Sequence, residues 1–147
     1  MVSRRGVLGG ATAMATALLG GCGFGSRRLV GATEEAAAAV DGVSEAEFEL
    51  DIGGTFARLL YGPVSLEAED RATGLAVFDE AMRAVVTTIH DTLDDSAARS
   101  VRVGGITGVL AGGEELSALD LGPETTAENP RLDRITAESF YLKYGLS

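Results

Sequence analysis

Residues 70–93, DRATGLAVFDEAMRAVVTTIHDTL, contain the clearest helical pattern of the chain. Its apolar residues recur at spacings of three or four and form one stripe: Leu75, Phe78, Met82, Val85, Ile89 and Leu93. Such a stripe is typical of an amphipathic helix that packs against a core. Polar residues lie away from its centre, and Asp94-Asp95-Ser96 follows it. We therefore expect one long helix over residues 70–93.

Strand-like sequence precedes this helix. Residues 45–52, EAEFELDI, alternate between apolar side chains and four carboxylates, which predicts a half-buried strand with an acidic, solvated face. Gly53-Gly54-Thr55 indicates a turn, and residues 56–60 and 64–68 are expected to form the returning strand. Pro63 has no N–H donor, which favours an edge position or a bulge there.

A second hairpin follows the helix. Residues 99–110, RSVRVGGITGVL, predict a glycine-kinked strand, and residues 115–121 return after Gly112-Gly113. A last short helix is expected from Pro130 toward Tyr144, and a first one over 33–40. The order of elements predicts an α+β fold: a two-layer sandwich of ferredoxin-like character, with an antiparallel sheet of about four strands, one long amphipathic helix and short flanking helices.

The N-terminal segment, MVSRRGVLGGATAMATALLGGC, has the order of an export signal. Arg4 and Arg5 supply positive charge, residues 6–19 are uncharged and apolar, and the small residues Gly20 and Gly21 follow. The apolar run is too short and too rich in glycine and alanine for a stable membrane span. We expect a removable signal at 1–21, a flexible tether at 22–32 and a single domain at 33–147.

Leu19-Gly20-Gly21-Cys22 resembles the bacterial lipobox. The resemblance implies cleavage just before Cys22 and a diacylglyceryl group on its thiol, so that acyl chains anchor the protein at the extracytoplasmic face of the cell membrane. An ordinary signal peptide with an incidental cysteine is the alternative. The segment from Ser3 to Leu8 resembles the twin-arginine export motif, but Val7 replaces the usual Phe, and the general secretory route stays open.

Within the domain, Val40-Asp41-Gly42-Val43, Phe48-Glu49-Leu50 and Val64-Ser65-Leu66 resemble small bacterial envelope domains. Uncharacterised lipoproteins and domains of the BON type share this layout of helix, strand, hairpin, helix and strand. The resemblance covers about residues 33–121, and Pro63 departs from it. It implies a binding or structural module rather than an enzyme.

Charge and cysteine content narrow the function classes. Without Arg4 and Arg5 the chain keeps 10 basic and 22 acidic residues, a formal charge of −12. Such a surface repels phosphate backbones, which argues against nucleic-acid binding. Cys22 is the only cysteine, so neither an intramolecular disulfide nor a cysteine-pair metal site can form.

The sequence offers few candidates for chemistry. His90 is the only histidine and could act with Asp91, Asp94 or Asp95, but an exposed histidine near a helix C-terminus is the simpler interpretation. Residues 104–108 are glycine-rich without a following lysine, so a bulged strand is expected and not a phosphate loop. Phe140, Tyr141 and Tyr144 form a docking patch or, as we favour, pack the terminal helix on the sheet.

We therefore expect no catalytic residue, metal or cofactor. The preferred hypothesis is a non-enzymatic interaction or assembly module of the cell envelope, with the bilayer and an unknown envelope protein as partners. The alternative is an accessory lipoprotein that binds a small ligand or a cation. A hydrolase that uses aspartate or glutamate is the least favoured hypothesis.

Overall fold

The computed structural model describes residues 21–52, 57–123 and 131–147, with side chains from Arg27 onward except that of Asp133. Its elements follow one another as α2 (Gly21–Ala38), β1 (Val43–Ala46), β2 (Glu49–Ile52), β3 (Arg58–Leu66), α3 (Arg71–Thr92), α4 (Asp95–Ser100), β4 (Arg102–Val109), β5 (Glu115–Leu116), η1 (Ala118–Leu121), η2 (Leu132–Arg134), η3 (Ala137–Phe140) and α5 (Tyr141–Tyr144).

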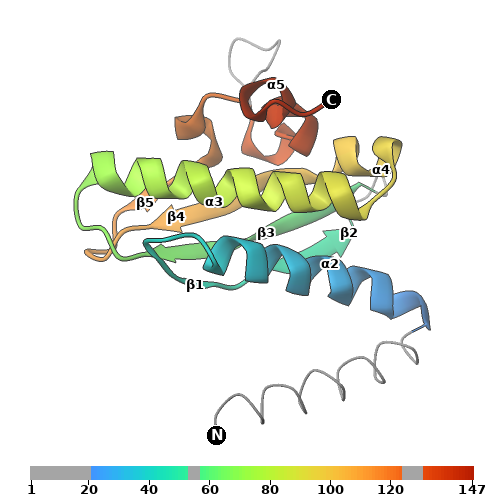
Figure 1. The fold of residues 1–147 in the computed structure, drawn as a ribbon, viewed down its shortest axis with the longest axis horizontal. Coiled ribbons are helices and arrows are strands. Elements are labelled where there is room, and N and C mark those ends of the chain that lie inside the picture. Colours follow the sequence, from blue (N-terminus) through green and yellow to red (C-terminus); the bar gives the residue numbers. More distant parts are fainter. Residues whose placement is uncertain (1–20, 53–56, 124–130) are drawn as a thin grey trace, which may run out of the picture.

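The molecule has two layers, a five-stranded sheet and a layer formed by α2 and α3 (Figure 1). The strand order is β1-β3-β4-β5. Strand β2 also pairs with β3, on the same edge as β1 and in line with it. Helix α2 covers the side of β1 and β2, and α3 contacts β3 and β4. The predicted α+β class with two layers is confirmed.

The sheet is mixed, whereas a wholly antiparallel sheet was expected. Strands β3 and β4 run parallel, with Leu59 opposite Arg102, and the remaining pairs are antiparallel. The physical reason is the length of α3, whose 22 residues span about 33 Å. The helix returns the chain to the end where β3 begins, so β4 starts beside the start of β3.

Strand β3 is continuous and lies inside the sheet, so the predicted edge position for Pro63 was wrong. The irregularity falls on its partner, where β1 and β2 share one register along β3 and are separated at Glu47 and Phe48. The Glu47 amide donates to the Pro63 carbonyl at 3.1 Å, but Pro63 has no N–H to return the bond. Gly62 precedes it with φ of 137°.

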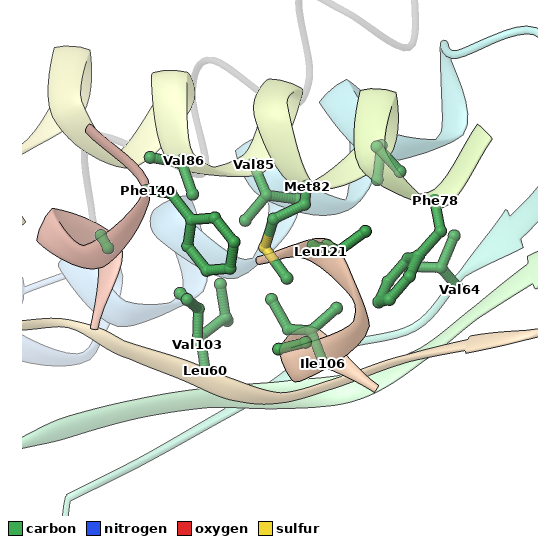
Figure 2. Close-up of a cluster of buried hydrophobic side chains, with 14 of the residues drawn as sticks. Leu60, Val64, Phe78, Met82, Val85, Val86, Val103, Ile106, Leu121 and Phe140 are labelled. Atoms are coloured by element: carbon green, nitrogen blue, oxygen red, sulfur yellow. The ribbon is translucent and has the colours of Figure 1, made fainter. Parts of the chain in front are cut away.

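The long helix predicted at 70–93 is confirmed as α3, Arg71–Thr92. The Asp70 carboxylate caps its start by accepting from the Thr73 amide at 2.8 Å. The central part of the predicted stripe is buried, since Phe78, Met82, Val85 and Ile89 each have 0% exposure, whereas Leu75 and Leu93 at its ends are only partly buried. Figure 2 shows the side chains of α3, among them Phe78, Met82 and Val85, facing those of β3 and β4, which are Leu60, Val64, Val103 and Ile106. Complete burial of one such side chain stabilises the fold by about 1.5–3 kcal/mol.

Helix α2 begins well before the helix predicted at 33–40, and it corrects the flexible tether expected at 22–32. Leu29 is 1% exposed and Thr33 and Ala37 are 0% exposed, so a spacing of four places all three on the face toward the core. Thr33, the first residue of the helix predicted at 33–40, lies inside α2 and donates its hydroxyl to the Leu29 carbonyl at 2.8 Å.

The C-terminal part is not one helix but the short turns η2 and η3 followed by α5. Residues between η2 and η3 add to the sheet instead: the Val103 amide donates to the Ile135 carbonyl at 2.9 Å, and the Ala137 amide donates to the Val101 carbonyl at 2.8 Å. Residues 124–130, which include the predicted helix start at Pro130, lie outside the described residues. No helix in the described ranges is long and apolar enough to cross a membrane.

Candidate functional site

The residues predicted to direct export and anchorage lie at the N-terminal end. Arg4, Arg5, Leu19 and Gly20 fall outside the described residues, whereas Gly21 and Cys22 begin α2. At a rise of about 1.5 Å per residue, about 10 Å of helix separates Cys22 from Leu29, which is part of the core. A group attached to Cys22 would therefore lie close to the folded domain.

A hollow of about 320 Å³ opens between α2 and β2 at this end of the domain. We call it the anchor-side hollow, and it is lined by Arg27, Val30, Gly31, Glu34 and Leu50. Glu34 uses its carboxylate to accept a hydrogen bond of 2.7 Å from the Phe48 amide. The exposed Arg27 side chain supplies a positive charge at its border.

An exposed apolar side chain ends the strand that contributes Leu50 to the anchor-side hollow. Ile52, two residues beyond Leu50 at the end of β2, is 60% exposed. Its partner across the β2–β3 pair is Arg58, whose side chain is also exposed. The neighbouring Asp51 carboxylate accepts from the Ile52 amide at 2.9 Å. Arg27 thus lines the anchor-side hollow, and farther along the β2–β3 pair an exposed apolar group, Ile52, faces a second cation, Arg58.

The sheet face that points away from α2 and α3 carries the predicted acidic row. Glu45, Glu47, Glu49 and Asp51 are all exposed. Beside this row, a hollow of about 260 Å³ is lined by Leu59, Tyr61, Arg102, Gly105 and Leu132, among others. The strand register shifts next to it, between the Leu59–Arg102 and Tyr61–Gly105 pairs, as the glycine-rich sequence predicted. This face combines carboxylates, an aromatic ring and one guanidinium.

His90 lies near the C-terminal end of α3, as predicted, and ties the end of the chain to that helix. Its Nδ1 is 2.8 Å from the Asp91 carboxylate, and its Nε2 is 3.2 Å from the Ser147 carbonyl. The Asp91 hydrogen bond, followed by the Ser147 carbonyl, raises the pKa of His90 above its ordinary value of 6.5. The rings of Tyr141 and His90 make an edge contact, with 5.5 Å between their centroids. Within the described part of the chain, no group of three His, Cys, Asp or Glu residues is placed to hold a metal ion.

The aromatic residues near the C-terminus pack inward, which supports the packing interpretation over a docking patch. Phe140 is 0% exposed and Tyr141 is 4% exposed. Tyr144 stacks on Phe140 at 5.6 Å and donates its hydroxyl to the Asp79 carboxylate at 2.7 Å. Burial, together with this hydrogen bond, raises the pKa of Tyr144. These contacts fasten α5 to α3.

Two clusters of ion pairs, each around one arginine, were not predicted from the sequence. Arg99 contacts Asp95 at 3.0 Å and Glu138 at 2.8 Å. The Asp95 contact has the i,i+4 spacing that sequence reading could have found, whereas Glu138 is brought near only by the fold.

The second cluster forms around Arg71, at the opposite end of α3. Arg71 contacts Glu114 at 2.7 Å and Asp120 at 3.1 Å. Both acidic partners lie more than 40 residues away along the chain, so no local spacing rule identifies them. The cluster links the start of α3 to the second hairpin.

Comparisons with known proteins add no assignment, because no protein-family model and no curated protein matches the chain.

Proposed function

We propose that the chain is an exported lipoprotein, held at the extracytoplasmic face of the cell membrane by acylated Cys22, and that its domain is a non-enzymatic interaction or assembly module. One observation carries the proposal: an export-signal sequence ends in Leu19-Gly20-Gly21-Cys22, and Cys22 lies in the first turn of a helix that packs into the domain. Cleavage before Cys22 would leave the domain intact and acyl chains at its border.

The sheet face away from the helices supports a binding role. Exposed carboxylates recur at every second residue of the β1–β2 edge, and Tyr61, 37% exposed, stands next to them. Aromatic side chains are enriched at protein interfaces. We propose this face as the contact for an envelope protein with a basic surface, because charge complementarity steers association. Nucleic acid is not a proposed partner, since phosphate backbones carry the same sign of charge.

The order of elements also supports a module of the envelope type. The structure runs through helix α2, strand β1, the β2–β3 hairpin, helix α3 and, after the short α4, strand β4. The resemblance to small envelope domains rests on such a layout of helix, strand, hairpin, helix and strand.

The test is the intact mass and membrane fractionation of the native protein beside a Cys22→Ala variant. We expect a membrane-bound chain that begins at residue 22 and carries a lipid mass, and an unanchored Cys22→Ala variant. A native protein that is uncut or free of lipid would overturn the anchorage. Crosslinking in cells tests the module: recovery of an envelope protein by the native chain, lost with Tyr61→Ala and Glu49→Arg, supports it, and no recovered partner contradicts it.

A second candidate function is favoured by the 260 Å³ hollow at Tyr61 and Arg102. Pockets that hold small molecules are mostly apolar and have a few polar groups. The domain would then be an accessory lipoprotein for a small ligand or, through its acidic row, a cation. Calorimetric titration with metabolites and divalent ions decides between the candidates: heat that disappears in Arg102→Ala supports a small ligand, and no heat removes this candidate.

A further inference from the structure

We propose that the anchor-side hollow and Ile52 form a docking surface for anionic phospholipid of the same membrane that holds the anchor. This inference rests on the proposed lipidation of Cys22 and adds a second, non-covalent contact with the bilayer. The surface consists of the five residues that line the hollow and of the pair Ile52 and Arg58, farther along β2 and β3. The lining residues are Arg27, Val30, Gly31, Glu34 and Leu50.

The position of the surface brings it to the bilayer. Arg27 lies five residues beyond Cys22 on the same helix, a rise of about 8 Å. Leu50 contributes to the hollow together with Arg27, and Ile52 ends the same strand. Acyl chains on Cys22 would hold these residues within reach of the headgroups, because a helix, unlike a flexible tether, keeps its two ends at a fixed separation.

Gly31 supplies an observation that packing does not explain. Glycine is among the weakest helix formers, yet it occupies the interior of α2. A Cβ at this position would meet no heavy atom within 4 Å, so no close approach inside the domain requires glycine. What the missing side chain does is keep the anchor-side hollow open, which suits a site that admits a molecule from outside.

The charges and the exposed apolar group fit an anionic lipid. Arg27 and Arg58 each offer a guanidinium group to the phosphates of the headgroup layer, and Val30, Leu50 and Ile52 offer apolar contact for the start of an acyl chain. Two acidic side chains of this region use their carboxylates to accept from backbone amides, Glu34 from Phe48 at 2.7 Å and Asp51 from Ile52 at 2.9 Å.

The net charge of the chain favours one orientation of the domain relative to the bilayer. The chain after residue 21 carries a formal −12, so an anionic bilayer repels most of the domain surface. The anchor-side surface, with its two arginines, is then the part that approaches the headgroups.

The experiment uses the lipidated protein reconstituted in phosphatidylcholine vesicles with or without phosphatidylglycerol. Cys22 is the only cysteine and its thiol is consumed by acylation, so Ile52→Cys provides a single site for a polarity-sensitive fluorophore. Leu142→Cys is the matched control, because Leu142 is 76% exposed on α5, across α3 from α2 (Figure 1). We expect a blue shift and quenching by lipid-borne quenchers at position 52 only, and only when phosphatidylglycerol is present.

Filling the hollow provides the second arm. Gly31→Leu improves helix propensity and occupies the hollow, so we expect a folded protein that has lost the response at position 52. Gly112→Leu, at a turn position with equally open space, should keep the response. Equal responses at positions 52 and 142, an equal response in pure phosphatidylcholine, or an unchanged response in Gly31→Leu would each overturn the docking surface. Failure of lipidation appears earlier, as a missing lipid mass, and overturns the proposed function itself.

Discussion

Replacement of Gly62 by alanine tests how β3 pairs with the strand edge that is interrupted between β1 and β2. Gly62 has φ of 137°, a conformation that is strained for any residue with a Cβ. An added Cβ would lie 2.1 Å from the Glu47 carbonyl oxygen, far inside van der Waals contact. Backbone strain of about 1–3 kcal/mol and loss of the neighbouring Glu47–Pro63 hydrogen bond at about 1 kcal/mol predict a total loss of about 2–4 kcal/mol.

The assay is guanidinium unfolding followed by circular dichroism, with Gly112→Ala as the control. Gly112 has no positive φ, and a Cβ added there would meet only open space, so its replacement should shift the free energy of unfolding by less than about 1 kcal/mol. A loss of stability in Gly62→Ala no larger than that in Gly112→Ala would contradict the strain at Gly62. A native domain is stabilised by only about 5–15 kcal/mol, so the expected loss is easily measured.

Four further outcomes are expected. Phe78→Ala should lower the free energy of unfolding by about 3–5 kcal/mol, because the ring is fully buried. A loss no larger than that caused by an alanine substitution at an exposed position would contradict the packing shown in Figure 2. Tyr144→Phe should cost about 1 kcal/mol in the same unfolding assay through its lost bond to Asp79, with no cost if that bond does not form in solution. Asp70→Ala should lower the melting temperature at neutral pH; since the Thr73 amide lowers the pKa of Asp70, melting curves of the two proteins should converge as the pH falls through that lowered value. The hydrogen bond to Asp91 raises the pKa of His90, so its stabilising contribution should be complete below pH 6.5 and lost as the pH rises through the raised value; melting curves of His90→Gln against the native protein, and an NMR titration of the imidazole, check this sign.

The long helix was predictable because its signal is local. An apolar stripe with a period of 3.6 residues needs only the sequence of α3, and the acidic alternation of residues 45–52 needs only the period of a strand. The break between β1 and β2 follows from Pro63, whose missing N–H was visible in the sequence. Which strand would carry the irregularity was not, because that depends on how the two strands are paired.

The remaining errors concern relations between distant segments. The parallel β3–β4 pair depends on where α3 returns the chain, and the split C-terminal elements depend on Ile135 and Ala137 pairing with β4. The start of α2 was missed because its glycines argue against a helix, while burial of Leu29 in tertiary packing overrides that weak preference. Tertiary context decided each of these outcomes.

The candidate site divides in the same way. The proposed anchor motif ending at Cys22 is contiguous, so the sequence alone is enough to propose it. The anchor-side hollow cannot, because Arg27 and Leu50 meet only when α2 packs on β2. The arginine clusters around Arg71 and Arg99 likewise combine one helix with remote carboxylates.

The hydrogen bonds that the Phe48 and Ile52 amides donate to carboxylates affect whether two copies of the domain can pair along this edge of the sheet. Because the Glu47 amide points toward β3, the amides of Phe48 and Ile52 point the other way, toward the rim of the sheet. Glu34 and Asp51 already occupy both amides. A strand from a neighbouring molecule that tried to extend the sheet here would have to displace a charged acceptor twice and bring its backbone into a row of negative charge. Copies concentrated on a shared surface could thus collide often without polymerising edge to edge.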